Sequence, residues 1–153
     1  MNQVPFYFYT MKKRVTVPFD LLSIEDDGFH VRVEILLNGR PALMLIDTGA
    51  SRTVFDKERL LHFIPDAEIT LADGTSTGLG TDSMEGHLVT LSSMEIGELK
   101  IPDREVALLD LVHVNKTFEK IGLMAIDGVL GSDLFVEYKA IIDYDKKELS
   151  LEA

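Results

Sequence analysis

The alternation of apolar and polar residues predicts a chain built mostly from β-strands. Apolar residues occupy every second position in residues 15–19 and again in residues 30–37, and this period of two is typical of a strand with one buried face. The dipeptide Asn38-Gly39 joins the second of these runs to residues 41–46 and favours a two-residue hairpin. We expect further strands at 53–55, 69–71, 88–96 and 100–109, the last two joined at Gly97, and a closing hairpin at 140–151.

Signals for helices are few and short. Asp56 can cap a helix that runs through Phe63 and ends before Pro65. Residues 115–121 are compatible with a helix that Gly122 would stop. The predicted fold class is therefore all-β, a single lobe with one or two short helices.

Residues 43–46 form an apolar run, typical of a buried strand, that leads directly into Asp47, Thr48 and Gly49. Burying a carboxylate at the end of such a strand costs several kcal/mol unless neighbouring groups hydrogen-bond it or its pKa rises. Gly49 lets the backbone fold close enough for main-chain N–H groups to reach the acid. Asp47 is therefore a candidate for chemistry, although a turn-forming aspartate would fit the same pattern.

The run Leu43-Met44-Leu45-Ile46-Asp47-Thr48-Gly49-Ala50-Ser51 resembles the active-site signature of aspartic peptidases, in their short retropepsin-like branch. About eighty residues later, 125–135 are similar to the second signature, in which the strand Val129-Leu130-Gly131 passes beside the Asp-Thr-Gly loop. The resemblance implies a short helix directly after Gly131. The resemblance covers about residues 15–152. It implies a single-lobe acid-protease fold, a closed β-barrel or sandwich, at 15–153, after an N-terminal extension at 1–14.

The resemblance also implies roles for individual residues. Asp47 corresponds to the catalytic acid, Thr48 to the residue whose hydroxyl braces the partner loop across a dimer axis, and Gly49 to the glycine whose carbonyl binds peptide backbone. Residues expected to support the active-site loop are Thr48, Gly49, Ala50, Ser51, Val129, Leu130 and Gly131. Retroviral enzymes often pair an acid and an arginine at the positions of Ser51 and Ser132, and this ion pair is absent from the sequence.

Residues 72–83 are rich in glycine and have two interpretations besides a plain surface loop. A phosphate-binding loop is disfavoured because no Gly-Lys-Ser or Gly-Lys-Thr follows. The resemblance instead implies a flap, a hairpin that folds over bound peptide, with candidate substrate-binding residues Gly74, Gly78, Leu79, Gly80 and Thr81. Pepsin-like enzymes carry a tyrosine where this chain has Leu79.

Peptide hydrolysis without a metal needs one group to take a proton from water and another to protonate the carbonyl. Two carboxylates that share one proton do both, as is established for aspartic-protease dyads. The chain contains a single Asp-Thr-Gly. The second acid must therefore come from a second copy of the chain or from an internal rival, of which Asp127 and Asp143 are the candidates.

Composition and charge exclude several other functions. Fifteen basic against twenty-six acidic residues give a net charge of −11, which disfavours nucleic acid and anionic membranes as partners. The chain has no cysteine, and its four histidines show no metal-ligand spacing, so we expect no metal and no cofactor. No apolar run could span a bilayer and no signal peptide is visible. A cytoplasmic location is favoured, although a leader removed by processing would leave the same sequence.

Two functional hypotheses follow. The first is an aspartic endopeptidase that acts on peptide or protein substrates through a dyad formed across a homodimer. The second is a retropepsin-fold domain for peptide binding or dimerisation with weak or lost catalysis, which the missing ion pair and the atypical flap favour. A phosphoryl-transfer enzyme would need alternating strands and helices, which the pattern does not contain.

Overall fold

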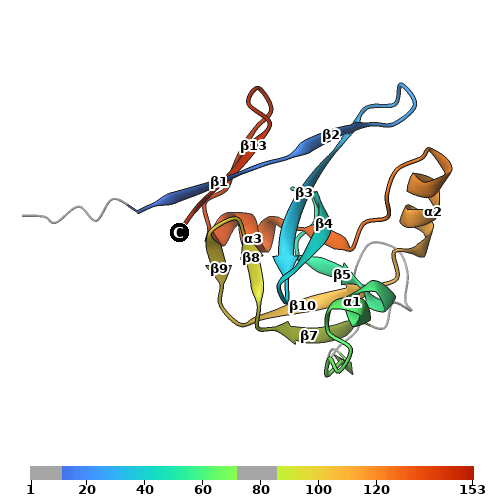
Figure 1. Cartoon of the computed structure of the whole chain (residues 1–153), viewed down its shortest axis with the longest axis vertical. Coiled ribbons are helices and arrows are strands. Elements are labelled where there is room, and N and C mark those ends of the chain that lie inside the picture. The colour runs from blue at the N-terminus through green and yellow to red at the C-terminus, as the bar shows by residue number, and fades with distance from the viewer. Residues whose placement is uncertain (1–11, 72–85) are drawn as a thin grey trace, which may run out of the picture.

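The computed structural model describes residues 12–71 and 86–153. Within them the chain forms a small antiparallel sheet, a larger mixed sheet and three short helices (Figure 1). The elements in chain order are β1 (Arg14–Pro18), β2 (Asp20–Ser23), β3 (Phe29–Leu37), β4 (Arg40–Ile46), β5 (Val54–Asp56), α1 (Lys57–Phe63), β6 (Thr70–Leu71), β7 (His87–Leu91), β8 (Met94–Ile96), β9 (Leu99–Ile101), β10 (Arg104–Leu109), α2 (Val112–Lys120), β11 (Gly128–Leu130), α3 (Ser132–Glu137), β12 (Ile141–Asp143) and β13 (Glu148–Glu152).

The larger sheet has the strand order β6-β7-β10-β5-β11-β4-β3-β8-β9, and β2 pairs with β3 beside this path. The smaller sheet has the order β1-β13-β12, so that the first and last described strands lie together. The mostly-β class predicted from the sequence is confirmed. The closed barrel is not confirmed, because the strands of the described residues pair in an open path. Three helices form in these residues, where one or two were expected.

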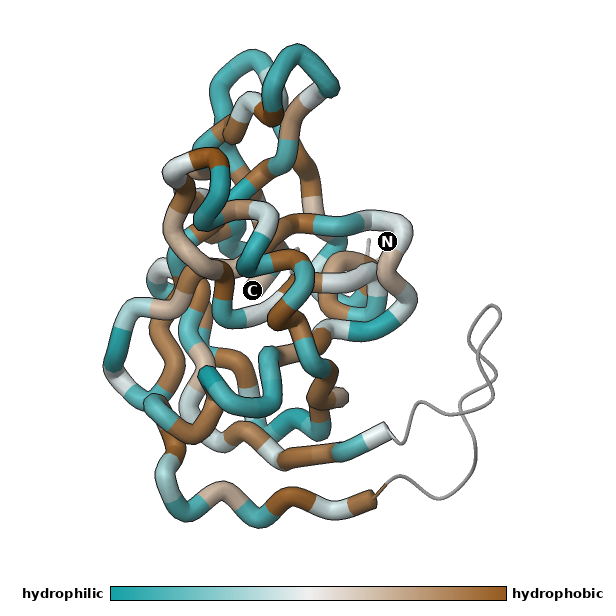
Figure 2. Tube along the Cα trace, turned by 90° about the vertical axis from the view of Figure 1, so that its right-hand side faces the viewer, coloured by the Kyte–Doolittle hydropathy of each residue, from teal (hydrophilic) through white to brown (hydrophobic). Residues whose placement is uncertain are grey.

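The main core lies against one face of the β3–β4 hairpin. In β3 the alternate residues Val31, Val33 and Ile35 are buried in this core, while Arg32 and Glu34 point to the other face. The hairpin turn is at Asn38 and Gly39, which both have positive φ, as the two-residue turn requires. Figure 2 shows the resulting alternation of hydrophobic and hydrophilic residues along the chain.

A smaller apolar cluster attaches α2 to the sheet. Its buried members are Leu45, Leu111, Phe118 and Ile126. The side chain of Asn115, also buried, both donates to and accepts from the backbone of Ile126, at 3.1 and 2.8 Å. The segment between β10 and β11 is therefore folded back on β4 and β11 rather than extended into solvent.

Strand β11 is inserted between two strands that come much earlier in the chain. It runs parallel to β4, with Val129 opposite Leu45, and antiparallel to β5, with Val129 opposite Val54. The fit is close at Gly128, where a Cβ atom would lie 2.4 Å from the carbonyl oxygen of Val54. A glycine is needed at this point because a larger residue would push the two strands apart.

Most predicted boundaries agree with the structure, and three differ. Asp56 caps α1 by accepting a hydrogen bond from the backbone N–H of Arg59 at 2.9 Å, as predicted. The single strand expected at 88–96 is instead two strands, β7 and β8, because the chain bends at Ser92. The region expected at 100–109 is likewise divided into β9 and β10.

Helix α2 begins three residues before the start predicted at Asn115. Two carboxylates accept backbone N–H groups at this earlier start. The second carboxylate oxygen of the buried Asp56 accepts the backbone N–H of Leu111 at 2.8 Å, and Asp110 accepts the N–H of Val112. Both bonds satisfy donors just before and at the first turn of the helix.

Candidate active site

Asp47 follows β4 directly and lies in a tight turn at the surface of the described chain. Its backbone N–H donates to the carbonyl of Leu130 in β11 at 3.1 Å, and its own carbonyl accepts from the N–H of Ala50 at 3.1 Å. Its carboxylate accepts the N–H of Gly49 at 2.9 Å. Asp47, Thr48 and Gly49 are all exposed. The backbone of the turn is thus fixed, while the carboxylate keeps acceptor capacity for other partners.

The first residue of α3, Ser132, is hydrogen-bonded to the backbone of the Asp47 loop. The Ser132 hydroxyl donates to the carbonyls of Thr48 and Ala50 at 3.1 and 2.8 Å, and the Ser132 N–H also donates to Ala50 at 2.8 Å. Gly131 makes this approach possible, because a Cβ there would lie 2.6 Å from the backbone of Arg52. Ser132 therefore links the second signature to the loop without the ion pair of retroviral enzymes.

The structure brings together most residues that the sequence predicted as loop supports. Val129 and Leu130 lie in β11 beside β4, and Gly131 and Ser132 contact the loop backbone as described above. Ser51 is exposed in the bend that follows the turn. The predicted flap residues Gly74, Gly78, Leu79, Gly80 and Thr81 lie outside the described residues.

A polar network under the loop was not predicted. The buried Thr53 donates both its backbone N–H and its hydroxyl to the Asp133 carboxylate at 2.9 Å, and its hydroxyl oxygen accepts the N–H of Gly131 at 3.1 Å. Arg104 in turn lies 3.5 Å from Asp133 and also pairs with Glu137. The network connects the residue before β5 with β10 and α3.

The charges in this network reinforce one another. Burial alone would lower the pKa of Arg104, but its hydrogen bond to Glu137 and the negative charges of Glu137 and Asp133 outweigh that effect and raise the pKa. Arg104 therefore stays protonated and keeps Asp133 oriented toward Thr53.

Asp127, the first internal rival of Asp47, is held in a structural role. It is 5% exposed, and its two carboxylate oxygens accept the N–H of Leu43 and the Nε–H of Arg59, each at 2.8 Å. Its backbone N–H also donates to Leu43. The second rival, Asp143, accepts the N–H groups of Asp145 and Lys146 in the turn after β12. Both acids thus serve as acceptors for nearby backbone.

The family of Aspartyl proteases matches residues 31–134, a range that contains the Asp47 turn, β11 and the start of α3. The chain belongs to the aspartyl protease family. The resemblance to retropepsin-like members that the sequence predicted is thereby confirmed. A comparison with curated proteins gives no match.

Solved structures of family members and related domains have the same fold. One is a retropepsin-like aspartic protease from Rickettsia conorii, 22% identical over 92% of this chain and 96% of that chain, with a TM-score of 0.50. A second is the retroviral protease-like domain of Ddi1 from Leishmania major, 13% identical over 78% and 86% of the two chains, with a TM-score of 0.51. A third is the EIAV protease in complex with the inhibitor HBY-793, 16% identical over 76% and 93%, with a TM-score of 0.52.

Two further findings concern metal binding and membrane-spanning helices in the described residues. No three of their histidine and acidic side chains are grouped closely enough to hold a metal ion. No helix among residues 12–71 and 86–153 combines the length and the apolar character needed to cross a membrane.

Proposed function

We propose that this member of the aspartyl protease family is an endopeptidase whose catalytic dyad consists of two Asp47 carboxylates, one from each chain of a homodimer. The observation that carries the proposal is the contrast between a fixed loop and an available acid. The backbone of the turn is hydrogen-bonded to Leu130 and Ser132, while the exposed carboxylate accepts one N–H, from Gly49.

A second copy is the source of the second acid because both internal rivals have other partners. Asp127 is buried and bound to Leu43 and Arg59, and Asp143 caps a turn. A twofold axis beside the exposed Asp47 turn would bring two identical carboxylates together, as closed symmetry produces in most homo-oligomers. One carboxylate takes a proton from the attacking water, and the other, protonated, donates to the carbonyl oxygen of the scissile bond.

The substrate in this proposal is a peptide in an extended conformation. The exposed Gly49 offers its carbonyl to the backbone of that peptide, in the manner of strand addition. The flap assigned from the sequence to Gly74, Gly78, Leu79, Gly80 and Thr81 stays a prediction.

Mixed dimers provide the sharpest test. Wild-type chain and Asp47→Asn chain are refolded together, and cleavage of a peptide library is measured from pH 3 to 8. If each site needs both carboxylates, an equal mixture retains roughly a quarter of the wild-type activity, because only dimers of two wild-type chains are active. A chain that acts alone would retain roughly half, and that result would refute the shared dyad.

The same assay tests the protonation state of the dyad. A mechanism with one protonated and one ionised carboxyl gives a bell-shaped dependence of activity on pH. Ala50 supplies no hydroxyl to stabilise the charged form, so we expect a mildly acidic optimum. Absence of cleavage at every pH, by a chain that nevertheless dimerises and binds peptides, would favour the alternative of a binding domain.

A further inference from the structure

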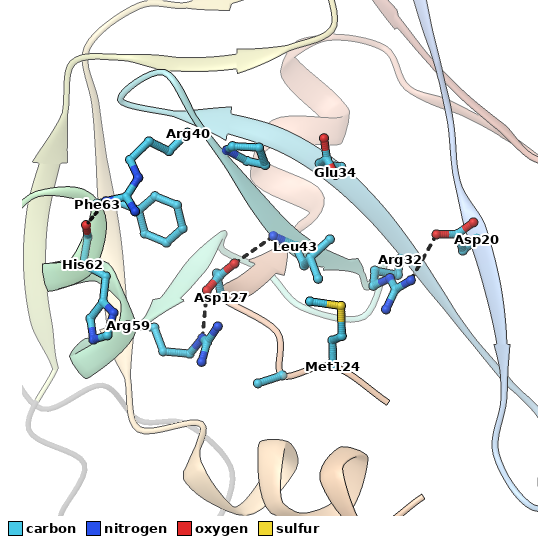
Figure 3. A pocket seen from close by; sticks show the side chains of 12 residues that line it. Asp20, Arg32, Glu34, Arg40, Leu43, Arg59, His62, Phe63, Met124 and Asp127 are labelled. Atoms are coloured by element: carbon cyan, nitrogen blue, oxygen red, sulfur yellow. Dashed lines mark hydrogen bonds and ion pairs between the residues drawn. The ribbon is translucent and has the colours of Figure 1, made fainter. Parts of the chain in front are cut away.

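A cavity of about 590 Å³ lies on the face of the β3–β4 hairpin opposite the main core. Its volume is in the range typical of pockets for small ligands. None of its lining residues belongs to the Asp47 turn or to β11, so the cavity is separate from the candidate active site. It is shown in Figure 3 and is lined by Asp20, Arg32, Glu34, Arg40, Pro41, Leu43, Arg59, His62, Phe63, Met124, Ala125 and Asp127.

Arginine is concentrated around this cavity. Three of the six arginines in the sequence, Arg32, Arg40 and Arg59, line it, although the chain as a whole carries a net charge of −11. The planar guanidinium group presents several N–H donors in a geometry that matches a carboxylate. A cluster of arginines in an acidic protein therefore points to an anionic ligand.

Acidic neighbours neutralise two of these arginines but leave the third without an acidic partner among the described residues. Arg59 pairs with Asp127 through its Nε atom, and Arg32 pairs with Asp20 at 3.2 Å. Arg40 donates to the carbonyl of His62 at 2.7 Å and lies over the ring of Phe63, 5.9 Å from its centroid. It forms no ion pair with a described acid.

Donors remain available on the same side of the cavity. Arg59 uses only its Nε–H toward described residues, which leaves its two terminal nitrogens for a ligand. Figure 3 shows Arg40 and Arg59 on the α1 side of Asp127, while Glu34 and Arg32 project from β3 on the other side. Glu34, the one lining acid with no ion pair to a described residue, thus lies away from the Arg40 and Arg59 groups.

The remaining walls are apolar. Pro41, Leu43 and Phe63 contribute aliphatic and aromatic surface to the cavity, and Met124 is 67% exposed at its edge. An exposed methionine is well suited to an adaptable contact, because its side chain is unbranched and polarizable. The ligand that matches both features carries a carboxylate next to an apolar body.

We propose that this cavity binds such a ligand, with its carboxylate at Arg40 and Arg59 and its apolar body on Leu43, Phe63 and Met124. An acidic residue beside an apolar one in a polypeptide has this chemistry, and so does a free arylalkanoic acid. The site does not depend on the proposed peptidase activity, because its residues and its readout are separate from Asp47.

The test is a binding titration followed by NMR on the full chain carrying Asp47→Asn, so that no peptide is consumed. The probes are N-acetyl-glutamyl-phenylalanine amide, its glutaminyl counterpart and 3-phenylpropionate. We expect the glutamyl peptide to bind about tenfold more tightly than the glutaminyl one, with shifts at Leu43 and Met124. Arg40→Gln should weaken the glutamyl peptide about tenfold, and Arg14→Gln, which removes the same charge from β1, should leave its affinity unchanged.

The two sources of the carboxylate give different patterns. Binding of 3-phenylpropionate as tight as that of the peptide supports a free acid as the ligand, and binding of the peptide alone supports a polypeptide segment. Equal affinity for the glutamyl and glutaminyl peptides would overturn the proposal. So would shifts confined to the Asp47 turn, an equal loss in Arg14→Gln and Arg40→Gln, or no saturation at millimolar concentration.

Discussion

Asp47 and Asp127 lie near opposite ends of the same pair of parallel strands, β4 and β11, and they differ in burial and in hydrogen bonding. Asp47 follows β4, is exposed, and accepts one backbone N–H at its carboxylate. Asp127 precedes β11, is 5% exposed, and uses both carboxylate oxygens, for Leu43 and Arg59. Among the described residues, one oxygen of the Asp47 carboxylate has no hydrogen-bond partner, whereas each oxygen of the Asp127 carboxylate has one.

This comparison shows that the neighbouring residues in the sequence do not by themselves distinguish an exposed aspartate from a buried, fully hydrogen-bonded one. Both aspartates stand next to apolar strand residues, and both are followed by a glycine within two positions. What differs is burial and the number of hydrogen bonds that each carboxylate accepts. Substitutions at the two ends should therefore separate turnover from stability.

The largest effect is expected for Asp47→Asn. The amide keeps the shape of the side chain but supplies neither charge nor base, so peptide cleavage should fall by about 10³-fold or more, which corresponds to about 4 kcal/mol of transition-state stabilisation. The free energy of unfolding should not decrease, because the side chain is exposed. Turnover and urea denaturation measured on one preparation would check both, and comparable activity in the two chains would show that Asp47 is not the catalyst.

Asp127→Ala should lower the stability of the fold and leave peptide cleavage by the folded protein largely unchanged. It leaves the N–H of Leu43 and the guanidinium of Arg59 without their acceptor, at a cost of roughly 2–3 kcal/mol in the free energy of unfolding. Urea denaturation measures this loss, and Asp127→Asn is the matched control, since its amide oxygen can still accept one of the two bonds. Cleavage per folded molecule should persist. A variant with full stability and no turnover would place Asp127 in the chemistry instead.

Gly131→Ala tests the contact between the two signatures. The added Cβ would meet the backbone of Arg52 at 2.6 Å and the carbonyl of Ala50 at 2.9 Å, and such overpacking costs about 1–3 kcal/mol. Because the displaced atoms belong to the Asp47 loop, turnover should fall as well. Gly128→Ala, which would instead meet Val54 and Met44, is the control for strand packing. A stable and fully active Gly131→Ala chain would contradict the predicted contact.

The smallest effect is expected for Ser132→Ala. It removes a hydroxyl that donates to the carbonyls of Thr48 and Ala50, a change worth about 1 kcal/mol. Stability should fall by that amount and cleavage by a few-fold, as the loop loses one brace, while Ser132→Thr retains the hydroxyl and should behave more like the wild type. Thermal denaturation and kinetics of the two variants would measure the difference.

Local signals in the sequence were sufficient for the parts of the fold that local contacts determine. Asn38-Gly39 specifies the hairpin because both residues tolerate positive φ, and Asp56 specifies the start of α1 because its carboxylate reaches an N–H three residues later. The Asp47 turn was predicted because its residues are consecutive. Its relation to β11 came from the family resemblance rather than from the pattern.

Contacts between distant residues account for what the sequence did not reveal. The N–H that precedes α2 is accepted by Asp56, 55 positions earlier, and Thr53 reaches Asp133 across 80 positions. The arginine cavity combines residues from β2, β3, β4, α1 and the segment before β11. No periodicity connects these positions, so only the folded topology brings them together.

The insertion of β11 between β4 and β5 also has a kinetic consequence. Residues 128–130 pair with residues 44–46 and 54–55, so a long stretch of chain must be closed before the three strands align, and such non-local pairing slows folding. During synthesis, the turn at Asp47 emerges long before the strand that holds its backbone. A nascent chain that ends before Leu130 thus carries the acid without its support, and the site is completed only after β11 has been made.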